Sequence, residues 1–131
     1  ILKLGLNGPL YRIVELTAYA DGTHNAFMYF WLTGILSGFL DNAPTYLVFF
    51  NTAGGNAEVL MTDLSNTLLA ISMGAVFLGA MTYIGNAPNF MVKSIAEENN
   101  IEMPSFFGYM IWSIIILIPV FILVSLIYFW S

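Results

Sequence analysis

The stretch Phe39-Leu40-Asp41-Asn42-Ala43-Pro44-Thr45-Tyr46-Leu47-Val48 decides the fold, because it places a carboxylate, an amide, a proline and a hydroxyl inside an apolar run. A second stretch, Tyr83-Ile84-Gly85-Asn86-Ala87-Pro88-Asn89-Phe90-Met91-Val92, repeats the pattern 44 residues further on. Both read apolar, apolar, small or acidic, Asn-Ala-Pro, polar, aromatic, apolar, Val. Proline removes a helical hydrogen bond and pushes the preceding residue toward extended geometry, so each stretch predicts a break in a helix.

The composition indicates that both breaks lie in a membrane. Of the 131 residues, 59% are hydrophobic and 8% are charged, whereas a soluble domain carries about 25% charged residues. Such a chain lacks the polar residues to cover a core in water, so lipid is its expected solvent. The absence of cysteine excludes disulfides and thiolate metal sites, and three basic residues leave no basic face for nucleic acid.

Charge and proline divide the chain into segments. We expect an amphipathic connecting segment or plain loop (1–24), a re-entrant hairpin (25–57), a broken transmembrane helix (63–98) and a final transmembrane helix (103–131). The last is supported by 26 uncharged residues from Ser105 to Trp130, about 39 Å as a helix. Ser65-Asn66-Thr67 lies at a helix start rather than in a break and is expected to cap that helix.

The first break allows two topologies. Residues 25–40 form a helix of about 24 Å, which is short of a hydrocarbon core of about 30 Å. Residues 26–53 therefore either cross as one kinked span or enter and return as a re-entrant hairpin with Asp41–Thr45 at its tip. Two glycines four residues apart in the first arm would allow close packing, and we favour the hairpin.

The two breaks also predict a binding site. Opened helices expose backbone carbonyl groups and half-helix ends, which coordinate small cations or attract anionic groups. The side chains add one carboxylate and several neutral oxygens of the kind that hard cations prefer. We expect a site for sodium, or for competition between sodium and a proton, at Asp41, Asn42, Thr45, Gly85, Asn86 and Asn89. If Asp41 is desolvated, its pKa should rise, which would let it exchange a proton near the working pH.

These motifs resemble a known superfamily. The run from Ser37 to Thr45 is similar to the S-x-F-L-D-N-x-P-T hairpin of the ion transporter superfamily, which includes sodium/proton antiporters, arsenite-efflux pumps, citrate transporters and sodium/dicarboxylate symporters. The segments 79–89 and 103–109 resemble the C-terminal end of its NhaD-like and citrate-transporter branch. The similarity covers roughly residues 30–131, and its motifs are specific to the superfamily rather than to a substrate.

The resemblance implies an all-α membrane protein with two inverted repeats, each with a hairpin and a broken helix that meet at mid-membrane around sodium. This chain would be a C-terminal fragment, and the remainder of the same polypeptide would complete a multi-pass protein of the plasma membrane, of the bacterial inner-membrane type. A homodimer is a further implication. The dicarboxylate symporters carry Ser-Asn-Thr at the tip, where this chain has Asp41-Asn42-Ala43, and an acid there would repel a carboxylate substrate.

We therefore expect a secondary transporter that exchanges sodium for protons, with no cofactor besides the transported ion. The alternative is sodium- or proton-coupled transport of citrate or another organic anion, and the absence of Arg from residues 13–131 counts against it. A channel is disfavoured because aquaporin motifs read Asn-Pro-Ala, and a non-transporting membrane subunit is a further alternative. No enzyme is expected, because no Ser/His, paired-carboxylate or His-pair arrangement lies on a span.

Overall fold

The computed structural model describes residues 11–20 and 22–130, and its regular elements there are helices, with one isolated bridge between Ala18 and His24. In chain order they are α2 (Tyr11–Leu16), α3 (Ala26–Ser37), α4 (Asn42–Thr52), α5 (Ala57–Met61), α6 (Ser65–Phe77), the 3₁₀ helix η1 (Leu78–Met81), α7 (Ala87–Glu98) and α8 (Phe106–Phe129). The all-α prediction is confirmed for these residues. Residues 1–10, part of the predicted amphipathic segment, lie outside them.

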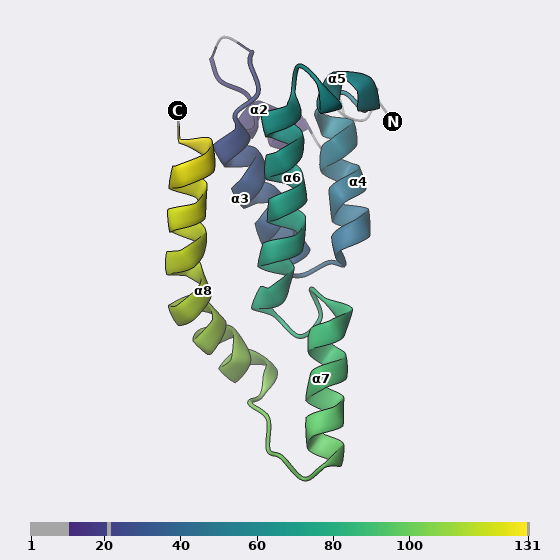
Figure 1. Ribbon diagram of the computed structural model, residues 1–131, viewed down its shortest axis with the longest axis vertical. Coiled ribbons are helices and arrows are strands. Elements are labelled where there is room, and N and C mark those ends of the chain that lie inside the picture. Colours follow the sequence, from purple (N-terminus) through teal and green to yellow (C-terminus); the bar gives the residue numbers. More distant parts are fainter. Residues whose placement is uncertain (1–10, 21, 131) are drawn as a thin grey trace.

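The first break joins α3 and α4 into a helical hairpin. Helix α3 begins at its cap Asn25, whose side-chain oxygen accepts from the amide of Met28 at 3.1 Å, and it ends at Gly38. Helix α4 begins after Asp41 and runs back beside α3, so that the tip lies at about half the height of the molecule (Figure 1). The described chain therefore has two antiparallel helical arms at this break. The depth of this hairpin in a bilayer stays a prediction.

Helix α6 packs along the hairpin and leads to the second break. Its Gly74 lies against the carbonyl group of Phe30 on α3, where an added Cβ would collide with that oxygen. The buried side chains of Phe30, Ile71 and Leu78 form the centre of the apolar core between α3, α6 and η1. Beyond the break α7 continues away from the hairpin (Figure 1). Helices α6 and α7 hold 13 and 12 residues, so each is about 18–20 Å long.

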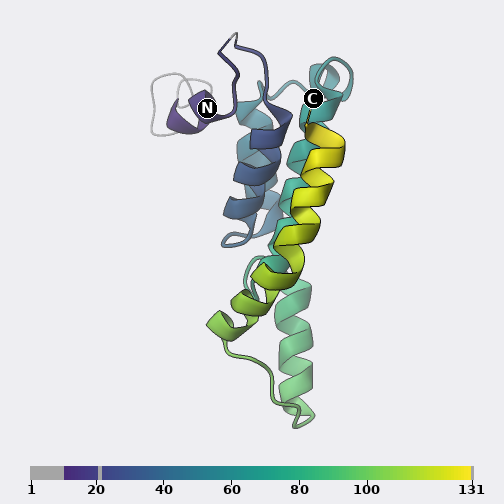
Figure 2. The same cartoon turned by 90° about the vertical axis from the view of Figure 1, so that its left-hand side faces the viewer.

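Helix α8 begins near the second break and rises beside η1 and α3, while α7 extends beyond its start in the opposite direction (Figures 1 and 2). Its 24 residues are about 36 Å long, and among the described residues it is the helix long and apolar enough to cross a membrane. Most of its isoleucine and leucine side chains are exposed, whereas Ser113 and Ser125 are buried. Near its end, Phe129 packs on Phe30 with ring centroids 5.4 Å apart. Most of the segment predicted as the final span is thus one continuous helix, and its crossing of a membrane stays a prediction.

Two local expectations need correction. The short helix α5, between the hairpin and α6, was not anticipated; it forms because the Asn56 side chain accepts from the amides of Glu58 and Val59, at 3.0 and 3.3 Å. The expected capping by Ser65-Asn66-Thr67 is wrong. Helix α6 begins at Ser65 with Leu64 in the cap position and without a side-chain cap, and the Thr67 side chain is buried.

Candidate functional site

The two Asn-Ala-Pro segments begin two helices whose N-terminal ends face one another. Helix α4 runs up from the hairpin tip and α7 runs down from the second break, so the two starts lie at the same height (Figure 1). The helices do not start at equivalent positions. Asp41 is the cap residue of α4, whereas Asn86, one position later in the repeat, is the cap residue of α7. The repeat is therefore one of sequence, and its two copies have different local structure.

Asn42 joins the hairpin to the second break. With its carboxamide oriented to suit its neighbours, the side-chain nitrogen donates to the carbonyl oxygens of Ala75 at 2.8 Å and Gly85 at 3.0 Å. The hydroxyl of Ser37, 2.8 Å from this nitrogen, donates to the same Ala75 oxygen at 2.5 Å. One polar cluster thus connects α3, α4, α6 and the break.

Thr82 makes a second connection between the same segments. Its side chain is 2% exposed, and its hydroxyl donates to the carbonyl oxygen of Gly38 at the hairpin tip, at 2.6 Å. The hydroxyl oxygen of Thr82 in turn accepts from the amides of Gly85 at 2.9 Å and Ile84 at 3.2 Å. A single buried hydroxyl therefore shapes the break and ties it to the tip.

The backbones at this crossing are so close that only glycine fits. A Cβ at Gly85 would lie 2.7–2.8 Å from the carbonyl oxygens of Ser37, Gly38 and Gly79. A Cβ at Gly79 would lie 2.8 Å from the Gly85 carbonyl oxygen and collide with the Asn42 side chain. Four backbone carbonyl groups, those of Ser37, Gly38, Gly79 and Gly85, consequently lie close together at the crossing. Carbonyl oxygens are the ligands that hard cations take, and helix ends of this kind bind ions in membrane proteins.

The remaining predicted site residues take different places around this crossing. The side-chain nitrogen of Asn89 donates hydrogen bonds to the carbonyl oxygens of Ala80 and Thr82, both at 3.1 Å. Thr45 is fully buried, and its hydroxyl has no hydrogen-bond partner in the described part of the chain. Asn86 is half-buried, and its side chain makes no capping hydrogen bond.

Asp41 is exposed, and one of its carboxylate oxygens accepts from the amide of Asn42 at 2.8 Å. This carboxylate therefore occupies the N-terminal end of α4, where the dipole of the helix favours a negative charge. The corresponding residue of the second copy is Gly85, so the start of α7 has no carboxylate of its own. Carbonyl oxygens, which attract cations, therefore lie at the ends of α3 and η1. Amide groups, which attract anions, lie beside them at the starts of α4 and α7.

Ser37, Gly79 and Thr82 were not among the predicted site residues. All three lie in the motif segments that carry the family resemblance. The 44-residue repeat aligns Thr82 with Gly38 and Ser37 with Met81, so neither hydroxyl residue is repeated in the other copy and the repeat did not mark them. A search for hydroxyl-bearing residues within two turns of each break would have found Ser37 and Thr82. Within residues 11–20 and 22–130, no three His, Cys, Asp or Glu residues come together as a metal-binding group.

A membrane-length apolar helix, a helical hairpin and a broken helix that meet at mid-height are features of secondary transporters as a class. The chain belongs to the family described as "Putative citrate transport", whose model matches residues 1–129. No curated protein and no solved structure matches the chain. The family is one of transporters rather than enzymes, which agrees with the citrate-transporter branch of the resemblance.

Proposed function

We propose that this chain forms the binding half of a secondary active transporter that moves citrate or a related organic anion together with sodium or protons. The observation that carries the proposal is the contact between the two Asn-Ala-Pro breaks, through Asn42 to Gly85 and Thr82 to Gly38. The description of the family supports an organic anion as the substrate.

The proposed mechanism assigns the cation to the carbonyl groups. The oxygens of Ser37, Gly38 and Gly79 surround Gly85. In the proposed mechanism they turn toward a small cation when the two breaks separate slightly. Asp41 supplies the negative charge that a cation or proton balances. Asn42, Thr45, Asn86 and Asn89 complete the polar surroundings that we propose for this ion.

The anion is assigned to the start of α7. Its first amide groups carry the positive end of the helix dipole, and in the part of the chain that the structure describes no carboxylate caps them as Asp41 caps α4. A cation at the carbonyl groups would neutralise Asp41 and remove its repulsion of the substrate. This gives a physical reason for coupled transport, because anion affinity then depends on an ion being bound first.

Sodium/proton antiport remains the second candidate. The observation in its favour is the exposed carboxylate of Asp41 at the hairpin tip, which is a group suited to exchanging a cation for a proton. Both candidates share the same surroundings: the lipid bilayer of a plasma membrane, the remainder of the polypeptide and a homodimer. We propose no cofactor, since the ion is cargo or coupling ion in either case.

The experiment uses the full-length protein in proteoliposomes. Uptake of radiolabelled citrate is measured with a sodium gradient, a pH gradient or neither, and a trapped pH probe follows additions of Na⁺ and Li⁺ without citrate. We expect citrate to accumulate only when an ion gradient is imposed. A sodium-driven pH change without citrate uptake would select the antiport candidate, and no response in either assay would contradict both.

A further inference from the structure

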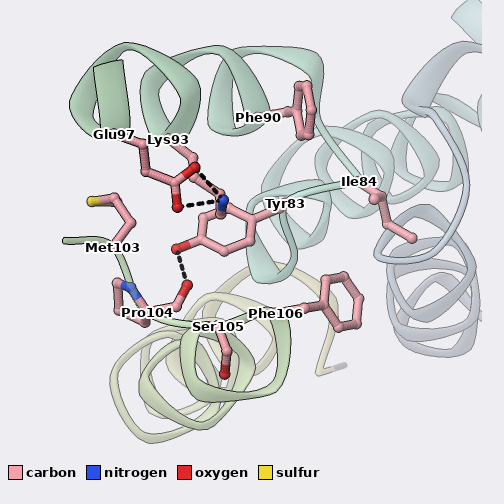
Figure 3. A pocket seen from close by; sticks show the side chains of 9 residues that line it. All are labelled: Tyr83, Ile84, Phe90, Lys93, Glu97, Met103, Pro104, Ser105 and Phe106. Atoms are coloured by element: carbon pink, nitrogen blue, oxygen red, sulfur yellow. Dashed lines mark hydrogen bonds and ion pairs between the residues drawn. The ribbon is translucent and has the colours of Figure 1, made fainter. Parts of the chain in front are cut away.

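A cavity of about 310 Å³ lies beside the second break, between α7 and the start of α8 (Figure 3). It is lined by Tyr83, Ile84, Phe90, Lys93, Glu97, Met103, Pro104, Ser105 and Phe106. Small-molecule sites occupy roughly 300–1,000 Å³, so the cavity is large enough for a small organic acid. Two of its lining residues belong to the break itself, which places it beside the site described above.

One ammonium group projects into this cavity. The Nζ atom of Lys93 lies 2.7 Å from each of the two carboxylate oxygens of Glu97 and 5.5 Å from the centre of the Tyr83 ring (Figure 3). The Lys93 side chain is 23% exposed. Tyr83 is itself fixed, because its hydroxyl donates to the Pro104 carbonyl oxygen at 3.1 Å and its ring stacks on Tyr109. The cavity therefore holds a positive charge in a defined position.

The ion pair contributes little to the stability of α7. A helical pair stabilises best with the acid four residues before the base, and here Lys93 precedes Glu97. Glu97 also lies in the last turn of α7, where the helix dipole disfavours a negative charge. Helix stability alone is thus a poor reason for this arrangement.

Lys93 is the only Lys or Arg in residues 13–131. A carboxylate entering the cavity would find one cationic side chain, already in contact with a carboxylate of the chain. Ammonium–carboxylate hydrogen bonds are among the stronger ones, and exchanging one carboxylate for another conserves them. The Glu97 carboxylate therefore occupies the position in which a substrate carboxylate would bind to Lys93.

We propose that Lys93 binds a carboxylate group of the transported organic anion in this cavity, and that Glu97 forms an ion pair with the Lys93 ammonium group when no substrate is bound. The inference rests on the proposed function, because it concerns the same substrate class. It adds an entry or exit site one to two helical turns from the break, with Tyr83 fixing the lysine and Glu97 competing with the substrate.

The test compares uptake kinetics of the full-length protein in proteoliposomes for Lys93→Gln, Lys93→Arg and Glu97→Gln. Glu98→Gln is the matched control, since Glu98 is the neighbouring exposed acid and does not line the cavity. We expect Lys93→Gln to raise KM for citrate about tenfold or more, and Lys93→Arg to recover part of that loss. Glu97→Gln should lower KM several-fold, because it frees the ammonium group.

The opposite signs separate the proposal from a structural ion pair. A structural pair predicts that Lys93→Gln and Glu97→Gln cause the same defect, and that outcome would overturn the inference, as would a wild-type KM in Lys93→Gln. The elution profile of each purified variant on size-exclusion chromatography shows whether it is folded, and Glu97→Gln remains informative if Lys93→Gln does not fold. Absence of citrate uptake in the wild type would instead refute the proposed function.

Discussion

Replacing Gly85 by alanine tests the crossing of the two breaks. The new Cβ would lie 2.7–2.8 Å from three carbonyl oxygens, where ordinary contacts begin near 3.4 Å. All three oxygens belong to the backbone, so no side chain can rotate away. The hairpin tip must therefore move from the break by about 0.6–0.7 Å. A shift of that size would stretch the 2.6 Å hydrogen bond from Thr82 to Gly38 toward the limit of a hydrogen bond.

The magnitude follows from these two effects. Overpacking costs about 1–3 kcal/mol and the loss of a neutral hydrogen bond about 1 kcal/mol, so we expect a destabilisation of about 2–4 kcal/mol. Displacement of binding groups by close to 1 Å can reduce a rate by about 100-fold, and we expect a similar loss of uptake.

Gly38→Ala is the matched variant. Its Cβ would lie no closer than 3.4 Å to any backbone oxygen, although the residue is part of the same crossing. Thermal unfolding of the purified proteins and citrate uptake in proteoliposomes are measured for both. Gly85→Ala should lower the melting temperature and the uptake far more than Gly38→Ala. Equal losses in the two variants would refute the close approach of tip and break.

Three further predictions concern single groups. Thr82→Val keeps the shape of the side chain but removes the hydroxyl that hydrogen-bonds to Gly38 and to two amides, so it should reduce stability by about 1–3 kcal/mol and impair uptake. Thr82→Ser keeps the hydroxyl and should retain both stability and uptake. The same melting temperature and the same uptake in the Val and Ser variants would contradict this. Gly74→Ala should destabilise the α3–α6 packing by about 1–3 kcal/mol in thermal unfolding, because the Phe30 carbonyl blocks its Cβ; an unchanged melting temperature would exclude that packing. Burial lowers the pKa of His24, which precedes α3, so its contribution to stability is full above about pH 6.5 and is lost as the pH falls through the lower folded-state pKa. The melting temperature of His24→Gln should therefore depend less on pH between 5 and 7 than that of the wild type, and parallel pH profiles would contradict this.

The sequence predicted the breaks because their causes are local. Pro44 and Pro88 end a helical pattern whatever surrounds them, and the uncharged run of α8 gives a membrane-length helix from composition alone. The same reasoning placed Asn42 and Gly85 in one site. The structure brings these two together, within 3.0 Å between the Asn42 side-chain nitrogen and the Gly85 oxygen.

The partners across the crossing could not be predicted, because they depend on how three helices pack. The Thr82 hydroxyl could have bonded within its own helix, and only the position of α3 directs it to Gly38, 44 residues away. The expectation that the Asn42 side chain offers oxygen to a cation also depended on orientation, and here its nitrogen faces the carbonyl groups. Lys93 was not among the predicted site residues. Its cavity arises from the return of the chain through Pro104, which local patterns do not encode.

The most direct test of coupling through the hairpin tip is citrate uptake under an imposed sodium or pH gradient for Asp41→Asn. Asparagine is as good a helix cap as aspartate, so this variant removes the charge while α4 still starts at the same residue. Asp63→Asn, at an exposed turn before α6, is the matched control. We predict that Asp41→Asn loses the response to the ion gradient and that Asp63→Asn keeps it. The same gradient response in both variants would contradict a role for Asp41 in coupling.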